Sequence, residues 1–406
     1  MRLRLALLTL ALGGFSLGAS EFAAMGVLPD IARDLLPELW TTSPDAAIAQ
    51  AGILISSYAA GVVVGAPLIA GTLSRYPRKA LLVGFAIAFT IGTVLSAAAP
   101  DFWTACAARF LAGLPHGAYF GIASIVAADL LGPGSRGRGV AFVISGLAVA
   151  NIVGVPLITG LGQAAGWRIA YLVIAGLFVV TTAALALAVP HQPGDPAATI
   201  RRELGALRIG QVWLALAIGA IGFGGMLAVN SYIAPMTTEL AGLSAGWVPW
   251  ALVAAGLGMF GGSWVGGRLA DRDPMRGLLI VLPLFALVLL GLALTGSWPP
   301  AAFAGFFLVG LLGGSLVPTV QTRLMAVAHE SQTLAAASNH SALNIGNGLG
   351  AALGAAVIAA GLGYRAPSLV GAGLAVLGFL IAIAAWLAER RGRAVVADAR
   401  TACPPA

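Results

Sequence analysis

Glu21 is a carboxylic acid inside a long apolar stretch, residues 5–28, near the start of the chain. An ionisable side chain at that depth of a membrane span costs about 2.5 to 3.5 kcal/mol on insertion scales and is for that reason a functional candidate. Burial changes the affinity of a carboxyl group for its proton, so proton binding can depend on which side a cavity faces. We interpret Glu21 as a proton carrier or as the partner of a cationic or polar substrate. The alternative is a structural carboxyl group satisfied by neighbouring helices.

Two further titratable or charged groups stand in a later apolar run, residues 102–128. Arg109 cannot lose its proton, so it needs a partner or a wet cavity; a structural clamp on backbone carbonyls is the other reading. His116 titrates in the physiological range, although a lone histidine is often only a hydrogen-bonded helix contact. Asp30, at the end of the first apolar stretch, is a second carboxylate that could carry a proton.

Polar and aromatic side chains interrupt several otherwise apolar runs and are candidates to line a substrate cavity. Some of them will be ordinary interhelical hydrogen bonds, which are worth about 0.6 kcal/mol each. The aromatic members equally suit packing or lipid contact. The candidates are Phe22, His116, Tyr119, Asn151, Asn230 and Asn344.

Composition indicates what kind of element positions these groups. Hydrophobic residues make up 59% of the 406 residues and charged residues only 9%, against about 25% charged in soluble domains. A membrane span needs about 20 apolar residues, and the polar interruptions mark twelve segments: 5–28, 47–72, 80–99, 102–128, 140–163, 168–189, 210–235, 246–269, 277–296, 299–322, 334–360 and 367–388. The start of the chain resembles a signal peptide, but its apolar run continues to Pro29, which favours a retained span.

The distribution of charge predicts the orientation. Most of the 22 basic residues fall in loops that are cytoplasmic if both termini are inside, as the positive-inside rule requires. The first outer loop is acidic, with Asp30, Asp34, Glu38 and Asp45. We therefore expect an inner-membrane protein with both termini cytoplasmic. The same sorting explains the net charge of +7, so we expect no nucleic acid as a partner.

An internal repeat divides the chain. Gly71 aligns with Gly267 at a separation of 196 residues, and the same shift places Asn151 on Asn347. Parallel repeats of six spans put a substrate site at the bilayer midplane between the halves. We predict a first bundle over 1–190, a cytoplasmic linker over 191–208, a second bundle over 209–390 and a cytoplasmic tail over 391–406. Two complete halves in one chain predict a monomer.

Five passages, residues 20–32, 71–79, 109–121, 151–156 and 339–347, together resemble the major facilitator superfamily. Within that family they are most similar to the twelve-span drug:proton antiporters of the chloramphenicol-resistance and arabinose-efflux branch. The resemblance implies an all-α membrane protein with twelve transmembrane helices in two pseudo-symmetric six-helix bundles. It also implies that Glu21 and Arg109 take part in proton coupling.

The resemblance further implies a conformational latch in the two repeated loops and close helix packing in the fifth span. The family normally carries an Asp after Gly-x-Leu-x; here that position is Arg75 in the first copy, whereas the second copy retains Asp271. The fifth span reads Gly-Val-Pro in place of the usual Gly-Pro pair. The latch and packing candidates are Gly71, Arg75, Arg78, Gly154, Pro156, Gly267, Asp271 and Arg272. The alternative for the basic members is that they only anchor loops at the membrane surface.

Together with the repeat, the resemblance implies proton-coupled efflux of a small molecule by alternating access, with a drug such as chloramphenicol as substrate. The alternative is a sugar or metabolite transporter. No phosphate-binding loop is present, so we expect energy from the proton gradient and no cofactor. The histidines, His116, His191, His329 and His340, fall in separate places without metal-like spacing, which argues against a metal site or a membrane enzyme. A channel or receptor fits a duplicated chain less well than a transporter does.

Overall fold

The computed structural model describes residues 2–73, 75–194, 201, 204–328 and 331–402, and these residues form helices and connecting turns with no strand among them. Apolar side chains alone would not dictate a helix. In a bilayer, however, each backbone N–H and C=O must bond within its own segment, and a helix achieves this.

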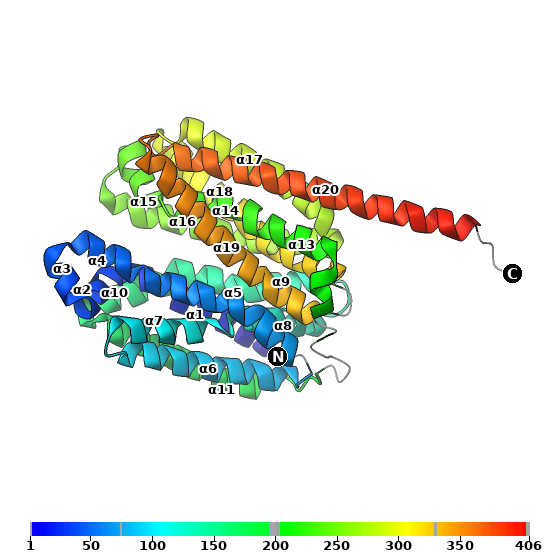
Figure 1. Cartoon of the computed structure of the whole chain (residues 1–406), viewed down its shortest axis with the longest axis horizontal. Coiled ribbons are helices and arrows are strands. Elements are labelled where there is room, and N and C mark those ends of the chain that lie inside the picture. The colour runs from blue at the N-terminus through cyan, green and yellow to red at the C-terminus, as the bar shows by residue number, and fades with distance from the viewer. Residues whose placement is uncertain (1, 74, 195–200, 202–203, 329–330, 403–406) are drawn as a thin grey trace.

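The chain forms two lobes, one above the other in Figure 1. The first lobe contains α1 (Arg2–Gly26), α2 (Leu28–Leu35), α3 (Pro37–Thr42), α4 (Pro44–Ala51), α5 (Ile53–Leu73), α6 (Arg78–Ala98), α7 (Phe102–Gly113), α8 (His116–Leu131), α9 (Arg136–Val149), the π-helical turn η1 (Ala150–Gly154), α10 (Val155–Ala165) and α11 (Trp167–Ala188). The second lobe contains the 3-10 turn η2 (Gly205–Arg208), α13 (Gly210–Ala217), the π-helical turn η3 (Ile218–Gly222), α14 (Gly224–Asn230), α15 (Ile233–Pro235), the π-helical turn η4 (Met236–Leu240), the 3-10 turn η5 (Ala245–Trp247), α16 (Val248–Arg272), α17 (Pro274–Thr295), α18 (Pro299–Val327), α19 (Gln332–Ala359) and α20 (Ala366–Ala402).

Twelve helical segments in the described part of the chain are long and apolar enough to cross a membrane. Each overlaps one of the twelve predicted segments, so the predicted fold class is confirmed. The sequence did not predict the short helices α2 and α3 between the first two spans, and it treated 47–72 as one helix where the structure has α4 and α5. It also treated the fourth span as one helix, whereas the structure breaks it into α7 and α8 at Leu114 and Pro115.

Each lobe is held together mainly by its own helices, with α1 against α9 and α11 in the first lobe and α16 against α18 in the second. The lobes meet where α9 packs on α16 and where α19 packs on both α5 and α8. We call this interface the seam. The predicted linker, 191–208, lies partly outside the described residues, and α20 continues past residue 390 to Ala402. The predicted domain boundaries therefore stay a prediction.

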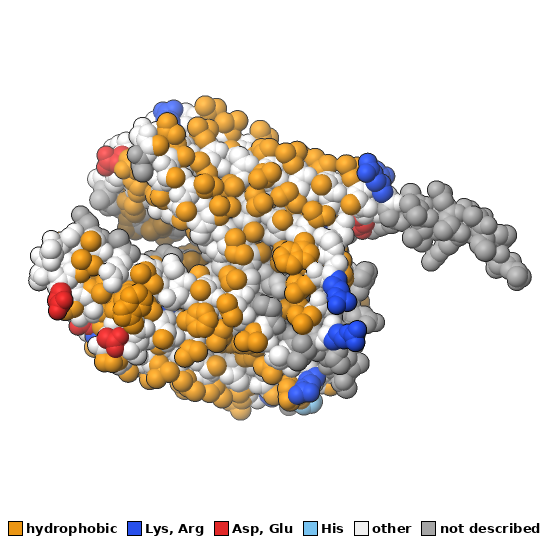
Figure 2. All heavy atoms as spheres, viewed as in Figure 1, with side chains coloured by type: hydrophobic (Ala, Val, Ile, Leu, Met, Phe, Trp, Pro, Cys, Tyr) orange, Lys and Arg blue, Asp and Glu red, His pale blue; other side chains and the backbone are white. Residues whose placement is uncertain are grey.

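The surface has the polarity of a membrane protein. Large apolar side chains such as Leu157, Leu187 and Trp298 are 68%, 86% and 65% exposed, and Figure 2 shows apolar atoms spread over the flanks of both lobes. Lys and Arg gather toward the end that carries the termini, which we call the terminal end, and acidic side chains toward the opposite, distal end (Figure 2). At the distal end the surface is hollowed between the two lobes.

The fifth span is irregular at its Gly-Val-Pro sequence. Pro156 lacks a backbone N–H, and the π-helical turn η1 over Ala150–Gly154 precedes it. A π-helical turn widens the helix locally and accommodates such a missing hydrogen bond. This irregularity lies on the face that packs against α1, the helix that carries Glu21.

Candidate functional site

Arg109 on α7 is the largest fully buried side chain of the described residues, with 1% exposure. Its Nη1 donates a hydrogen bond of 3.3 Å to Ser20 Oγ. The guanidinium carbon lies 4.3 Å from the centre of the Tyr58 ring and 5.7 Å from that of Tyr171. Nε and Nη2 have no hydrogen-bond partner. A permanent cation is therefore held mainly on aromatic faces, with two donors free for a substrate or water.

Glu21 follows Ser20 on α1 and is 9% exposed. Its carboxylate interacts electrostatically with Arg109, but no ion pair within 4.0 Å joins them among the described residues. The structure thus brings together Glu21 and Arg109, which the resemblance had linked. Their Coulomb attraction exists only while Glu21 is ionised.

Tyr58 extends this pair toward His116. Its hydroxyl lies 2.9 Å from His116 Nδ1, and the two rings meet edge to face at 5.7 Å between centroids. Tyr58 is 2% and His116 1% exposed. We call Glu21, Arg109, Tyr58 and His116 the coupling cluster; its members come from α1, α7, α5 and α8. Sequence reasoning missed Tyr58, whose only signal was a hydroxyl-bearing ring in an apolar run.

The coupling cluster reaches the second lobe through His340 on α19. The imidazoles of His116 and His340 lie 5.2 Å apart between centroids, and Phe120 stacks on His340 at 4.2 Å with 14° between the planes. The prediction that the histidines lie apart from one another is therefore wrong for His116 and His340, which meet in the fold. Sequence separation concealed the contact, because the packing of α8 against α19 joins the two lobes.

Polar groups continue along the seam beside these rings. Gln321 Nε2 donates to Ser124 Oγ at 2.9 Å across the lobes, and Asn339 Nδ2 donates to Gln321 Oε1 at 3.3 Å. Ser341 Oγ donates to the Val62 carbonyl at 3.2 Å. All these side chains except Val62 are polar and buried. The seam is therefore a hydrogen-bonded interface that needs new partners, such as water, when it opens.

The other cavity candidates lie in different surroundings. Tyr119 is inside the first lobe, where its hydroxyl donates to the Leu10 carbonyl at 3.4 Å. Asn151 donates to Leu147 of its own helix at 3.2 Å, and Asn344 donates to the carbonyl of His340 at 2.9 Å. Asn230 has a buried Oδ1 without a hydrogen-bond partner. Phe22 is half-buried beside Glu21. Of this set, His116 contacts the other lobe through His340.

Asp30 lies apart from the coupling cluster. It lines a cavity of about 520 Å³ at the distal end, together with Asp34 and Arg168. Asp34 pairs with Arg168 and accepts a hydrogen bond of 3.0 Å from Trp167 Nε1, and Arg168 also donates to the Ala99 carbonyl at 3.1 Å. Partial burial raises the pKa of Asp34, but the hydrogen bonds from Arg168 and Trp167 outweigh it, so the net pKa is lowered. This distal clamp ties α2 to α11.

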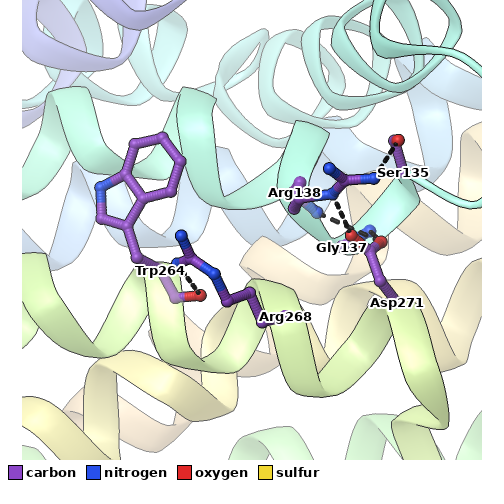
Figure 3. A network of polar contacts seen from close by, with 6 residues as sticks. All are labelled: Ser135, Gly137, Arg138, Trp264, Arg268 and Asp271. Atoms are coloured by element: carbon purple, nitrogen blue, oxygen red, sulfur yellow. Dashed lines mark hydrogen bonds and ion pairs between the residues drawn. The ribbon is translucent and has the colours of Figure 1, made fainter.

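Asp271 joins the lobes at the terminal end (Figure 3). Its carboxylate accepts hydrogen bonds from Gly137 N at 2.6 Å and from Arg138 Nε at 2.7 Å, and Arg138 Nη2 also donates to Ser135 Oγ at 2.6 Å. Gly137 is in the first turn of α9, where free N–H groups and the helix dipole favour an anion. The predicted latch residue thus holds a helix of the other lobe.

Gly267 permits this approach of α9 to α16. A Cβ atom at Gly267 would lie 2.6 Å from Ala141 Cβ and 2.8 Å from the Gly137 carbonyl oxygen. Beside it, Trp264 meets Phe142 edge to face at 5.6 Å, and Figure 3 shows Arg268 turned back along its own helix to the Trp264 carbonyl.

The first copy of the loop makes contacts within its own lobe. Arg75 is exposed and lies over the Tyr76 ring, with its guanidinium carbon 5.0 Å from the ring centre. Arg78 forms an ion pair of 2.5 Å with Asp129. Gly71 lies near the end of α5, and Arg272 is exposed at the end of α16.

Gly154 lies where the fifth span meets α1. A Cβ atom there would come within 2.9 Å of the Phe15 ring, so the glycine allows close packing. Pro156, two residues further, is exposed.

Comparison with known proteins places this site in context. Residues 10–339 match the model of the Major Facilitator Superfamily. The inner membrane transport protein YdhP of Escherichia coli is 38% identical over 381 residues, covering 94% of this chain and 96% of that protein. The chloramphenicol resistance protein of Streptomyces lividans is 34% identical over 384 residues, covering 94% of each chain. AraJ of Escherichia coli is 33% identical over 362 residues, covering 88% of this chain and 89% of that protein.

Solved structures share the fold at lower identity. The crystal structure of the human organic anion transporter MFSD10 superposes with a TM-score of 0.74 at 15% identity, covering 94% of this chain and 99% of that one. The relatives and the twelve spans together describe a multi-pass membrane protein.

Proposed function

Because this chain belongs to the Major Facilitator Superfamily of membrane transporters, we propose that it exports a small molecule in exchange for protons. The observation that carries this proposal is the coupling cluster, in which a buried carboxyl group acts on a permanently charged and incompletely bonded arginine. A purely structural arginine would be expected to have its donors satisfied.

The exchange proceeds by alternating access around the seam. In the state described above, Asp271 and the polar seam close the terminal end, whereas the surface is hollowed at the distal end (Figure 2). Rocking of one lobe against the other would open the terminal end and close the distal one. The substrate site then lies between the lobes near the coupling cluster, with His116 in contact with His340 and Asn344 one helical turn after it.

Proton coupling follows from the charge balance at Arg109. When Glu21 is ionised it offsets the cation, and when it is protonated Arg109 loses that compensation and seeks another partner. The two conformations then differ in their proton affinity, which is the requirement for coupled transport. We assign Glu21 and Arg109 to coupling. Asp30 is the weaker candidate, because it belongs to the cavity at the distal clamp.

The proposed substrate is a neutral or weakly polar drug of the chloramphenicol type. Support comes from the relative named as a chloramphenicol resistance protein and from the few acids inside the membrane. A sugar or metabolite is the second candidate, because the same neutral, hydrogen-bonding cavity residues would suit it.

We further propose an inner-membrane location with both termini cytoplasmic, supported by the basic terminal end (Figure 2). We also propose that the protein acts as a monomer.

Accumulation in efflux-deficient cells tests the proposal. Cells that express the protein should accumulate less chloramphenicol, or less of one member of a panel of dyes and sugars, and a protonophore should abolish the difference. Glu21→Gln should abolish it as well, whereas Glu239→Gln, at an exposed carboxylate in η4, should not. Export that persists with the protonophore would contradict proton coupling.

A further inference from the structure

His340 is a buried titratable residue of the second lobe and has no role yet in the proposed proton coupling. Its side chain is 4% exposed, and its Nε2 atom has no hydrogen-bond partner. One face of the ring stacks on Phe120, and its edge meets His116. Both neighbours belong to α8, so the environment of this imidazole exists only while the seam is closed.

The charged and titratable groups that act on His340 belong to the first lobe. His116 acts on it electrostatically, and Arg109 acts in turn on His116. Tyr58 on α5 is bonded to His116. Glu21 interacts with Arg109 and Tyr58, at the other end of the cluster.

On the remaining helices that pack on α19, no carboxylate of the described residues is hydrogen-bonded to His340. On α18, Gln321 is neutral and Arg323 is paired with Glu389 of α20 and with Gln211 of α13. The segments η3 and α14 contain no titratable residue. A proton on His340 would thus lie beside His116, on which Arg109 acts, and its Nε2 has no acceptor among the described residues.

We propose that His340 is a second proton-binding residue of the transporter and that its protonation opens the seam. The inference rests on the proposed function and extends it to the second lobe. With the seam closed, a positive charge on the ring is repelled by the cationic side of the cluster and lacks a hydrogen-bond acceptor. Opening parts α8 from α19, removes the repulsion and admits water to Nε2. Linkage then requires that proton binding favours the open seam and proton release the closed one.

This direction fits an exchange. A proton that enters from the distal side drives the lobes toward the state open at the terminal end, where the proton leaves. The return step proceeds with His340 neutral and stacked on Phe120. His340 therefore links the charge state of the coupling cluster to the geometry of the interface.

The test measures the seam without any substrate. Spin labels are attached at Ala80→Cys on α6 and Arg276→Cys on α17, two exposed positions near the terminal ends of opposite lobes. The background carries Cys106→Ser and Cys403→Ser. In the wild-type background the distance between labels should lengthen as the pH falls between about 8 and 5, the range in which histidines titrate.

Two uncharged variants, His340→Gln and His340→Asn, should lose this dependence and keep the short distance throughout. His191→Gln, which removes an exposed histidine outside the seam, should retain the dependence. A role of His340 in packing alone would change the distance at every pH and leave its pH midpoint in place, and that result would overturn the proposal. A wild-type distance that does not vary with pH would overturn it too. Failure of the proposed function would appear separately, as export that a protonophore leaves unchanged.

Discussion

At the scale of single residues, the buried charge of Arg109 must be stabilised by the residues around it. Arg109 cannot give up its charge, and it is almost completely buried. The Tyr58 face supplies an attraction of about 2 kcal/mol when such a contact is desolvated, and Glu21 supplies a charge that can be switched off. This is why we propose that the cluster responds to a single proton.

Tyr58 carries out two tasks that substitution can separate. Tyr58→Phe keeps the ring beneath Arg109 but removes the hydroxyl bonded to His116. A lost hydrogen bond of about 1.4 kcal/mol predicts a roughly tenfold slower proton-driven export, with normal expression. Tyr58→Leu also removes the ring and should slow proton-driven export further. The comparison is initial export rates in inverted vesicles, with Tyr76→Phe at an exposed tyrosine as control; equal rates for Tyr58→Phe and wild type would exclude the hydroxyl from coupling.

Asp34 in the distal clamp predicts a pH dependence of stability. Although partial burial raises its pKa, the hydrogen bonds from Arg168 and Trp167 lower it overall. A carboxyl group with a lowered folded-state pKa stabilises the fold above its ordinary value of about 3.9 and loses that contribution as the pH falls through the folded value. Asp34→Asn should therefore lower the melting temperature at neutral pH, with the difference from wild type vanishing in acid. Glu38→Gln, at an exposed carboxylate of α3, should show no such trend.

At the scale of elements, the pairing of α9 with α16 is the part of the seam most dependent on small side chains. Asp271 bonds to the first turn of α9 only because Gly137 and Gly267 let the two backbones approach. The retained acid of the second loop copy is thus useful only in combination with glycines on both helices. In the first copy, Arg75 stays within its own lobe on Tyr76.

Gly267→Ala should weaken the closed seam. The added Cβ would overlap Ala141 and the Gly137 carbonyl, and overpacking of this kind costs about 1 to 3 kcal/mol. That is enough to shift the balance about tenfold toward the open terminal end, visible as a longer distance between labels at Ala80 and Arg276. Gly291→Ala, where no atom lies within 4 Å of the new Cβ, is the matched control. An unchanged distance in Gly267→Ala would mean that α9 and α16 do not control closure.

The elements also show what sequence patterns can and cannot predict. Apolar length predicted the twelve spans, and the repeat register aligned Gly267 and Asp271 with the first loop, because both signals can be read from the sequence without knowing which helices touch. The contact of His116 with His340 was not predictable, since it depends on how α8 and α19 meet across the lobes. Tyr58 was missed for a similar reason: its partners are on α7 and α8. Asp30 looked equivalent to Glu21 by charge alone, but the distal clamp separates them.

At the scale of the whole molecule, the proposed coupling lets one proton affect a large movement because the coupling cluster contacts the second lobe. Glu21, Arg109, Tyr58 and His116 lie in the first lobe, and His340 belongs to the second. A change of charge in the first lobe is therefore felt where the lobes meet. The terminal latch at Asp271 and the polar seam define one end state, and the distal hollow marks the opening that must close in the other (Figures 1 and 2).

The central claim is that export and proton movement are coupled through Glu21, and proton flux in liposomes tests it most directly. The purified protein is reconstituted with a pH-sensitive dye inside, and a gradient of the substrate found in cells, such as chloramphenicol, is imposed without any pH gradient. Wild-type protein should move protons against the direction of the drug, and Glu21→Gln should move the drug down its gradient without protons. Equal proton movement by Glu21→Gln and wild type would contradict the account.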